Sequence, residues 1–398
     1  MQRENTLIRM TTVPISLKVL LRQQLKFMAA YYNVLAVSSP EKELEQVAAA
    51  EGVRTKSVRM TRSITPLEDL KALWSLYKLF KKEKPLIVHT HTPKAGLLGM
   101  LASRLAGVPI RIHTVAGLPL METKGGKRKL LELVEKLTYM CAHRVYPNSK
   151  NLARFIIQSR FCKESKLKVL GNGSSNGINT AFFAPTPDIM NEASVLKQRL
   201  GLHENDFVFV FIGRLVKDKG IQELVQAFTT LKERYPQIKL LLVGPYEQAL
   251  DPLSQETLNQ IEQDPAIVQV GFQQDVRPYL AISQALVFPS YREGFPNVPM
   301  QAGCMELPSI VTDINGCNEI IEEGKNGLIV PVKDDKSLEA AMERLLEDKV
   351  LYTRLKENAR PMIVERFDQN RLWKAILQEY QELQTEYENV SKLSQAIA

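Results

Sequence analysis

A polar turn early in the segment 290–330 carries the side chains best suited to bind a charged ligand. Glu293, Gly294 and Pro296 follow an apolar strand expected at 285–288 and precede a short helix. The start of a helix offers free backbone N–H groups and a positive dipole end, and in open α/β sheets it faces the crevice beyond the strand ends. The segment therefore predicts an anion site with a carboxylate beside it.

A basic turn about eighty residues upstream points to the same chemistry. The continuous apolar run 206–212 is typical of a buried parallel strand, and Gly213, Arg214 and Lys219 follow it before a helical pattern begins. A sugar that leaves its nucleotide puts growing negative charge on the diphosphate, which a fixed guanidinium and ammonium can stabilise. Taken alone, such a turn is usually a solvated loop. The turn's other two charged residues, expected to face solvent, are Lys217 and Asp218.

Together these motifs resemble the signature of the retaining family-4 glycosyltransferases, in which a Glu opens the helix and a second Glu follows eight residues later. The resemblance implies that Glu293 holds hydroxyls of the donor sugar, while Arg214 and Lys219 contact the diphosphate. The second carboxylate position, which holds the ribose, is Gln301 here. An amide still hydrogen-bonds vicinal hydroxyls but brings no charge. Asn297 is among the residues expected to distinguish donor sugars by the configuration of their hydroxyl groups.

A later turn at 313–319 matches the diphosphate-contacting loop of the same family through Gly316 and Glu319. Its alternative interpretation is a strand-to-helix turn with a capping glutamate. Many family members also carry a His followed by Gly in the loop that corresponds to 114–117. This chain has Ala116 in place of that histidine. His113 lies three residues earlier and could replace the missing side chain only if the backbone of the loop turned differently.

The elements that must position these residues alternate between strand and helix along the whole chain. Alternation of this kind predicts parallel sheets with crossover helices. Strands are expected at 7–13, 34–37, 86–90, 111–114, 144–147 and 168–170, and then at 207–212, 239–243, 267–270, 286–288, 309–312 and 328–330. Helices are expected between them, including one at 17–31.

The predicted fold class is α/β, with two doubly wound Rossmann-like domains facing a central cleft, the arrangement called GT-B in the family. A length of 398 residues with 44% hydrophobic content suits two cores. The expected domains are an acceptor-binding domain at 1–185 and a nucleotide-sugar domain at 195–368. A last helix at 369–398 is expected to cross back to the first domain, with an ordinary terminal helix as the alternative.

Three strand ends in the first domain supply candidates for the acceptor side. These polar segments are 11–16, 89–94 and 113–117, and their candidate residues are Ser16, His91, Lys94 and His113. His89 is expected to be a hydrogen-bonded structural residue. Because residues that alternate along a strand point to opposite faces, a zinc site from His89 and His91 is not expected, and neither is any other metal site.

Charge is divided unevenly between the two halves. Residues 1–190 hold 30 Lys and Arg against 13 Asp and Glu, so this half is strongly basic whereas the remainder is acidic. The asymmetry fits a membrane surface, a lipid-linked phosphate or nucleic acid, or it only solubilises the chain. Nucleic acid is not expected, because aromatic residues are not interleaved with the charges.

Two basic stretches favour contact with an anionic membrane. Segment 67–84 carries apolar residues at helical spacing beside five lysines, and the stretch 124–129 adds four more positive charges. Packing against the sheet explains the apolar stripe equally well. No apolar run reaches the length of a membrane-spanning helix, the start lacks a signal sequence, and the four cysteines suit a reducing compartment. We therefore expect a cytoplasmic protein, peripherally bound at the cytoplasmic face of the inner membrane.

The resemblance implies a retaining glycosyltransferase that moves a hexosyl or N-acetylhexosaminyl residue from a nucleotide-sugar, expected to be a UDP-sugar. The expected acceptor is a polyprenyl-diphosphate-linked saccharide in surface polysaccharide biosynthesis. No enzyme nucleophile is expected, because the resemblance implies that a donor phosphate oxygen takes the acceptor proton. No metal or other cofactor is expected, because side-chain cations and a helix start already face the phosphates. The alternatives are a nucleotide-sugar epimerase and a non-catalytic nucleotide-sugar-binding protein of the same fold.

Overall fold

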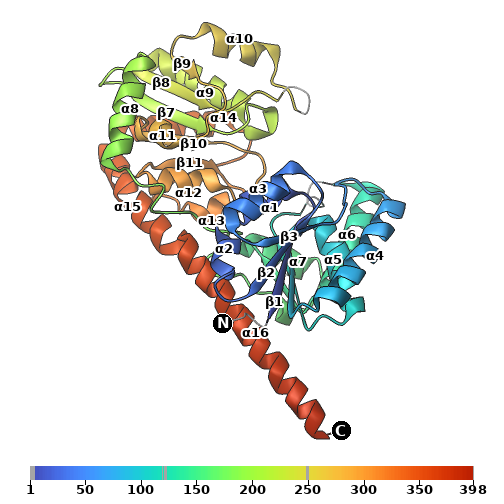
Figure 1. Ribbon diagram of the computed structural model, residues 1–398. Coiled ribbons are helices and arrows are strands. Elements are labelled where there is room, and N and C mark those ends of the chain that lie inside the picture. The colour runs from blue at the N-terminus through green and yellow to red at the C-terminus, as the bar shows by residue number, and fades with distance from the viewer. Residues whose placement is uncertain (1–4, 119, 121–122, 248–250, 398) are drawn as a thin grey trace. The chain divides into compact units, whose positions relative to one another are not determined.

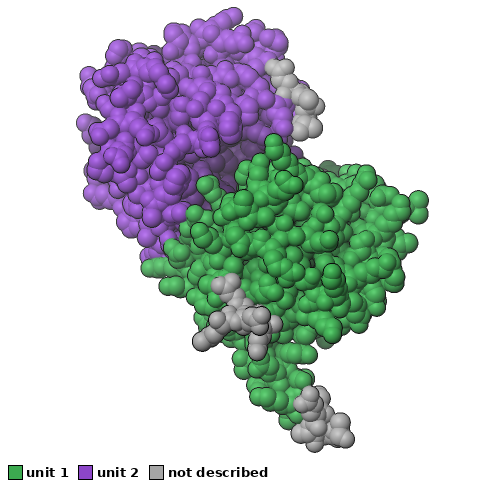
Figure 2. Space-filling view, viewed as in Figure 1, with its two compact units in different colours: residues 1–177, 369–398 green, residues 178–368 purple. Residues whose placement is uncertain are grey.

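The computed structural model describes residues 5–118, 120, 123–247 and 251–397. It divides into two compact units (Figure 2): unit 1 comprises 1–177 and 369–398, and unit 2 comprises 178–368. The predicted first domain, 1–185, ends too late and the predicted second domain, 195–368, begins too late: unit 2 already begins at 178 and contains the whole of α8 (Pro187–Arg199). The buried side chains of α8 explain this, because they pack in the core of unit 2.

Unit 1 is built on a parallel sheet of six strands in the order β3-β2-β1-β4-β5-β6; Figure 1 labels β1, β2 and β3. Neighbouring side chains of a strand enter different cores: Leu7 packs in one cluster and Ile8 in the other. Both faces are therefore covered, which explains the uninterrupted apolar runs. The strands are β1 (Thr6–Met10), β2 (Asn33–Ser38), β3 (Arg54–Ser57), β4 (Ile87–Thr90), β5 (Ile110–Val115) and β6 (Arg144–Pro147).

Helices of unit 1 divide between these two cores. One core receives side chains of α4 (Pro66–Glu83), α5 (Pro93–Ala106), α6 (Gly125–Cys141) and α7 (Lys150–Gln158). The other receives side chains of α1 (Pro14–Leu20), α2 (Gln24–Met28), α3 (Lys42–Glu51) and α16 (Gln369–Ile397). The final helix, α16, thus contributes Leu372, Ile376 and Tyr380 to the core of the unit that begins the chain.

Unit 2 repeats the architecture with strand order β12-β11-β10-β7-β8-β9. Its strands are β7 (Phe207–Ile212), β8 (Ile238–Val243), β9 (Ile267–Gln269), β10 (Ala285–Phe288), β11 (Ser309–Thr312) and β12 (Gly327–Val330). Besides α8, its helices are α9 (Ile221–Arg234), α10 (Gln255–Gln263), α11 (Arg277–Ala281), α12 (Asn297–Cys304), α13 (Cys317–Ile320), α14 (Asp335–Glu347) and α15 (Lys349–Phe367). Two doubly wound parallel sheets confirm the predicted α/β fold class.

Two predicted elements differ from the structure, and one strand was not predicted. The helix expected at 17–31 is two helices, because Gln23 adopts a left-handed conformation between α1 and α2. The edge strand β3 was not predicted. The predicted strand at 168–170 is not formed, although Leu167, just before it, makes an isolated bridge to Val145 of β6. Within the described residues, no helix is both long and apolar enough to cross a membrane.

Gly220 fixes the approach of two loops in unit 2. Its φ is +70°, and a Cβ there would lie 2.1 Å from the carbonyl oxygen of Pro289. Only glycine tolerates both the conformation and the contact. The turn after β7 can therefore lie directly against the turn after β10.

We predict that Gly220→Ala destabilises unit 2 by about 2–4 kcal/mol, because the methyl group overlaps the Pro289 carbonyl. Gly201→Ala is the matched control, since Gly201 also has positive φ but no atom within 4 Å of the added Cβ; it should cost about 1 kcal/mol. Urea unfolding followed by circular dichroism measures both. Both tryptophans, Trp74 and Trp373, belong to unit 1, so the unfolding transition followed by their fluorescence should not move. Equal losses of stability in Gly220→Ala and Gly201→Ala would contradict the proposed overlap with Pro289.

Candidate functional site

The candidate site lies at one edge of the unit 2 sheet. Strands β11, β10, β7 and β8 are neighbours and run parallel, so the turns that follow them leave the sheet at the same edge. Every donor-side residue predicted from the sequence lies in, or just after, the turn that follows β7, β10 or β11. This edge is where ligands bind in open α/β sheets.

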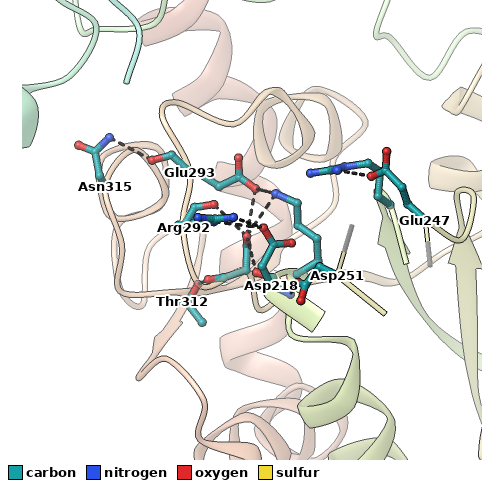
Figure 3. A network of polar contacts seen from close by, with 10 residues as sticks. Asp218, Glu247, Asp251, Arg292, Glu293, Thr312 and Asn315 are labelled. Atoms are coloured by element: carbon teal, nitrogen blue, oxygen red, sulfur yellow. Dashed lines mark hydrogen bonds and ion pairs between the residues drawn. The ribbon is translucent and has the colours of Figure 1, made fainter. Parts of the chain in front are cut away.

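Lys219 and Glu293 form the centre of the site (Figure 3). Nζ of Lys219 donates to Oε1 of Glu293 at 2.5 Å, and the two side chains are only 14% and 18% exposed. The hydroxyl of Ser290, which is fully buried, donates to the same carboxylate oxygen at 3.1 Å. Lys219 ends the short helix η3 (Lys217–Lys219), and Glu293 lies in the turn after β10. The pair therefore joins the two turns that carry the predicted chemistry.

Arg214 lies in the same turn as Lys219 but has a different partner. Its guanidinium pairs with the carboxylate of Glu247, in the segment that follows β8. The Arg214 side chain is 47% exposed, so the guanidinium is available to an incoming anion. Gly213 precedes it, and a Cβ on Gly244 would overlap the Gly213 carbonyl oxygen. The close approach of these two glycines brings the turns after β7 and β8 together.

Asp218 does not face solvent as the sequence analysis predicted. Its carboxylate is 16% exposed and accepts from Nε and Nη2 of Arg292 at 3.1 and 3.0 Å (Figure 3). Its backbone N–H donates to Asp251 at 2.6 Å. Lys217, in contrast, is exposed as expected. The Asp218–Arg292 pair is a second link between the turns after β7 and β10, and it holds the backbone from which Lys219 and Glu293 extend.

The turn after β11 packs against the turn that carries Glu293. Gly316 has φ +79°, and a Cβ there would lie 2.8 Å from the carbonyl oxygen of Gly294. The side-chain amide of Asn315 donates to the carbonyl oxygens of Glu293, at 3.3 Å, and Gly294 (Figure 3). Glu319 lies in α13, directly after this turn. Sequence analysis missed Asn315, and only its position beside Gly316 could have indicated it.

Helix α12 begins just beyond Glu293 and carries two further predicted residues. Asn297 is exposed at its first position and Gln301 is half-buried one turn later. Residues four apart lie on the same helix face. Beneath this region, burial, with the nearby Glu293 carboxylate as a smaller cause, raises the pKa of the Cys317 thiol well above its usual range. Cys317 is therefore a protonated core residue.

Unit 1 places its four candidates in different settings. Ser16 is half-buried in α1. Lys94 is largely buried, and its Nζ lies 2.6 Å from Asp69, so it anchors the start of α4. His113 is buried; Nδ1 lies 2.8 Å from the Thr90 hydroxyl, and burial lowers the pKa of His113 to about 4. We therefore assign Lys94 and His113 to structural roles and not to a ligand site.

His89 and His91 lie side by side. Because β4 ends at Thr90, alternation stops before His91, and the two ring centroids are 4.2 Å apart. His89 is hydrogen-bonded, with Nε2 lying 2.7 Å from the Thr114 hydroxyl and Nδ1 beside the Tyr380 hydroxyl. His91 accepts from Nε of Arg9 at 3.0 Å. His91 is the candidate that retains an unpartnered buried nitrogen, Nδ1.

Two family models match this chain over most of its length. The model for a glycosyl transferase 4-like domain matches residues 21–173, and the model for glycosyl transferases group 1 matches residues 193–362. The boundary between the two matches falls near the boundary between the units.

Individual proteins agree with the family models. A capsular polysaccharide biosynthesis glycosyltransferase of Staphylococcus aureus is 36% identical over 358 residues, which cover 90% of this chain and 92% of that protein. The UDP-Gal:alpha-D-GlcNAc-diphosphoundecaprenol alpha-1,3-galactosyltransferase of Escherichia coli is 32% identical over 78% of each chain. The crystal structure of Anabaena HepE in complex with UDP has a TM-score of 0.81 at 19% identity, covering 95% of this chain and 100% of that one. The chain described here belongs to the family-4 glycosyltransferases and has the GT-B fold.

Proposed function

We propose that this glycosyltransferase transfers a hexosyl or N-acetylhexosaminyl residue from a UDP-sugar, with retention of configuration, to a polyprenyl-diphosphate-linked saccharide. The observation that carries the proposal is the Lys219–Glu293 contact at the carboxyl edge of the unit 2 sheet. A cation and a carboxylate at one point suit a sugar diphosphate, which has an anionic end and a hydroxyl-bearing end. The E. coli relative takes its sugar from a UDP donor and acts on a diphosphoundecaprenol-linked acceptor, as its name states, and HepE was crystallised with UDP.

In this proposal each residue has a distinct task. Lys219 and Arg214 neutralise the charge that develops on the departing diphosphate. Glu293 accepts hydrogen bonds from the sugar hydroxyls, and Gln301 on α12 bonds the ribose through its neutral amide. The donor phosphate oxygen takes the acceptor proton on the face from which the nucleotide leaves, so no enzyme nucleophile is needed. Since two side-chain cations face the phosphates, we propose that transfer requires no divalent metal.

The first test of this proposal is transfer itself. We expect one UDP-sugar to give a lipid-linked product in the presence of a polyprenyl-diphosphate saccharide and EDTA, with the anomeric configuration of the donor. Mass spectrometry detects the product and NMR reports its configuration. GDP-sugars serve as the donor control. Release of an epimerised sugar or free UDP-sugar isomer from donor alone would instead identify an epimerase, and tight donor binding with no turnover under any acceptor would identify a binding protein.

Substitution at the central pair tests the assigned roles. We predict that Lys219→Met and Glu293→Gln each lower kcat on the order of 10²–10³-fold, because both act on the transferring group. Lys217→Met is the matched control: it removes the same charge two residues away from an exposed side chain and should leave kcat within about twofold. If Lys219→Met retains wild-type kcat, Lys219 has no part in diphosphate departure.

We also propose that unit 1 binds anionic membranes through an exposed stripe on α4. The helix already buries one face in the core through Ala72, Leu76, Leu79 and Phe80. A second apolar stripe remains outside, with Leu67 78%, Leu70 63% and Trp74 56% exposed. Packing against the sheet does not account for these three side chains. Residues at this spacing beside Lys71, Lys78 and Lys81 suit the headgroup region of an anionic bilayer.

Helix α6 also exposes apolar residues beside basic ones. Leu130 and Leu133 are 44% and 63% exposed, and Lys127 and Lys129, which the sequence analysis placed in a basic stretch, lie in its first turns. Both α4 and α6 pack against α5 and lie in one helical layer (Figure 1). A membrane-bound acceptor is reached most readily by an enzyme that stays on the same surface.

Vesicle binding tests this surface. Replacing Leu67, Leu70 and Trp74 with serine should weaken binding to vesicles of anionic phospholipid by about tenfold or more, since three large apolar side chains no longer enter the interface. The control replaces Val195 and Val350 of unit 2, which are 68% and 78% exposed, with serine and should bind as the wild type does. Sedimentation with vesicles measures both, and equal binding of the two variants would exclude the α4 surface.

A further inference from the structure

Arg9 on β1 is a fully buried cation without an acidic partner. Its Nε donates to Nε2 of His91 at 3.0 Å and its Nη2 donates to the side-chain oxygen of Gln24. Its Nη1 is buried and has no partner among the described residues. Both partners that it has are neutral groups. A buried guanidinium without a counter-charge is costly, because Arg stays protonated in proteins and has lost its hydration.

The hydrogen bond from Arg9 determines the tautomer of its neighbour. Because Nε2 of His91 accepts a hydrogen bond from Arg9, the neutral ring carries its own hydrogen on Nδ1. Burial, with the charge of Arg9 as a smaller cause, lowers the pKa of His91 well below its usual range, so the ring is neutral. Its Nδ1 is likewise buried without a partner. Arg9 and His91 therefore present two donor nitrogens without partners, Nη1 and Nδ1, and one full positive charge.

Both residues line one small cavity at the carboxyl ends of β1, β4, β5 and β6. The cavity has a volume of about 20 Å³, which is enough for at least one water-sized particle. The rest of its wall includes Thr114, Tyr146, Asn148, Ser174 and Ile376. Two segments far apart in the chain, the Ser174 loop and helix α16, thus close over the end of β1.

We propose that this cavity binds one monatomic anion of the size of chloride, which serves as the counter-ion of Arg9 and accepts from Arg9 Nη1 and His91 Nδ1. A water molecule would satisfy the two donors but leave the charge uncompensated, whereas a halide ion supplies both an acceptor and a negative charge. Asn148 Oδ1, also unpartnered, is an acceptor and is satisfied by a neighbouring water and not by the anion. The site is independent of the donor site in unit 2 and of the proposed transfer reaction.

Thermal unfolding of the full chain tests the proposal. Fluorescence of the two tryptophans, both in unit 1, is followed in sodium chloride, bromide or gluconate at constant ionic strength; gluconate is too bulky to enter. In chloride and bromide, Tm should rise by about 3 °C or more for each tenfold increase in halide above its dissociation constant. Gluconate alone should give the lowest Tm. The same Tm in all three salts would overturn the proposal.

Two variants locate the effect. Arg9→Met removes the charge at similar volume and should abolish the halide response. Arg111→Met is the matched control, since Arg111 lies on β5 of the same sheet and donates to the carbonyl oxygens of Cys141 and Val108; it should lower Tm but keep the halide response. A halide response retained in Arg9→Met would contradict the assignment.

If Arg9→Met does not fold, anomalous diffraction from bromide-soaked crystals of the wild-type chain tests whether the cavity holds an anion. An anomalous peak within hydrogen-bond distance of Arg9 Nη1 and His91 Nδ1 is the expected result. Density of a water without anomalous signal at that position would show that the cavity holds solvent and not an anion.

Discussion

The contact between Lys219 and Glu293 is the interaction on which the candidate site depends. It places a cation from the turn after β7 within 2.5 Å of a carboxylate from the turn after β10, and these strands are neighbours in the sheet. The backbone beneath the pair is fixed twice, by Gly220 against Pro289 and by the Asp218–Arg292 ion pair. Pre-organisation of this kind matters because a site that stabilises developing charge acts best when its dipoles need not reorient.

Much of this arrangement could be predicted from the sequence, and the reasons are physical. The strands of unit 2 are buried on both faces, so they appear as uninterrupted apolar runs such as 207–212, and the turns that follow them must share one sheet edge. What could not be predicted depends on contacts between distant residues. Glu247 reaches Arg214, and Arg292 reaches Asp218, from separate turns; nothing in the local sequence indicates either pair.

The same distinction explains the errors in unit 1. The break between α1 and α2 is stabilised by Glu51, whose carboxylate accepts from the backbone N–H groups of Gln23 and Lys26 at 2.7 and 3.0 Å. The apolar pattern of 17–31 continues through that break, so periodicity alone predicts one helix. Strand β3 is polar and largely exposed at the sheet edge, where the apolar signal of a strand is lost. The burial of Arg9 could not be predicted from the sequence either, because the groups that surround it come from distant parts of the chain.

We propose above all that Lys219 contacts the diphosphate of the donor and that Glu293 hydrogen-bonds its sugar. A crystal structure of the chain with an intact UDP-sugar tests it most directly. We expect a diphosphate oxygen within about 3 Å of Lys219 Nζ and a hexose hydroxyl at hydrogen-bond distance from the Glu293 carboxylate. A bound UDP-sugar whose diphosphate lies elsewhere, with the Lys219–Glu293 contact undisturbed and untouched by ligand, would contradict it.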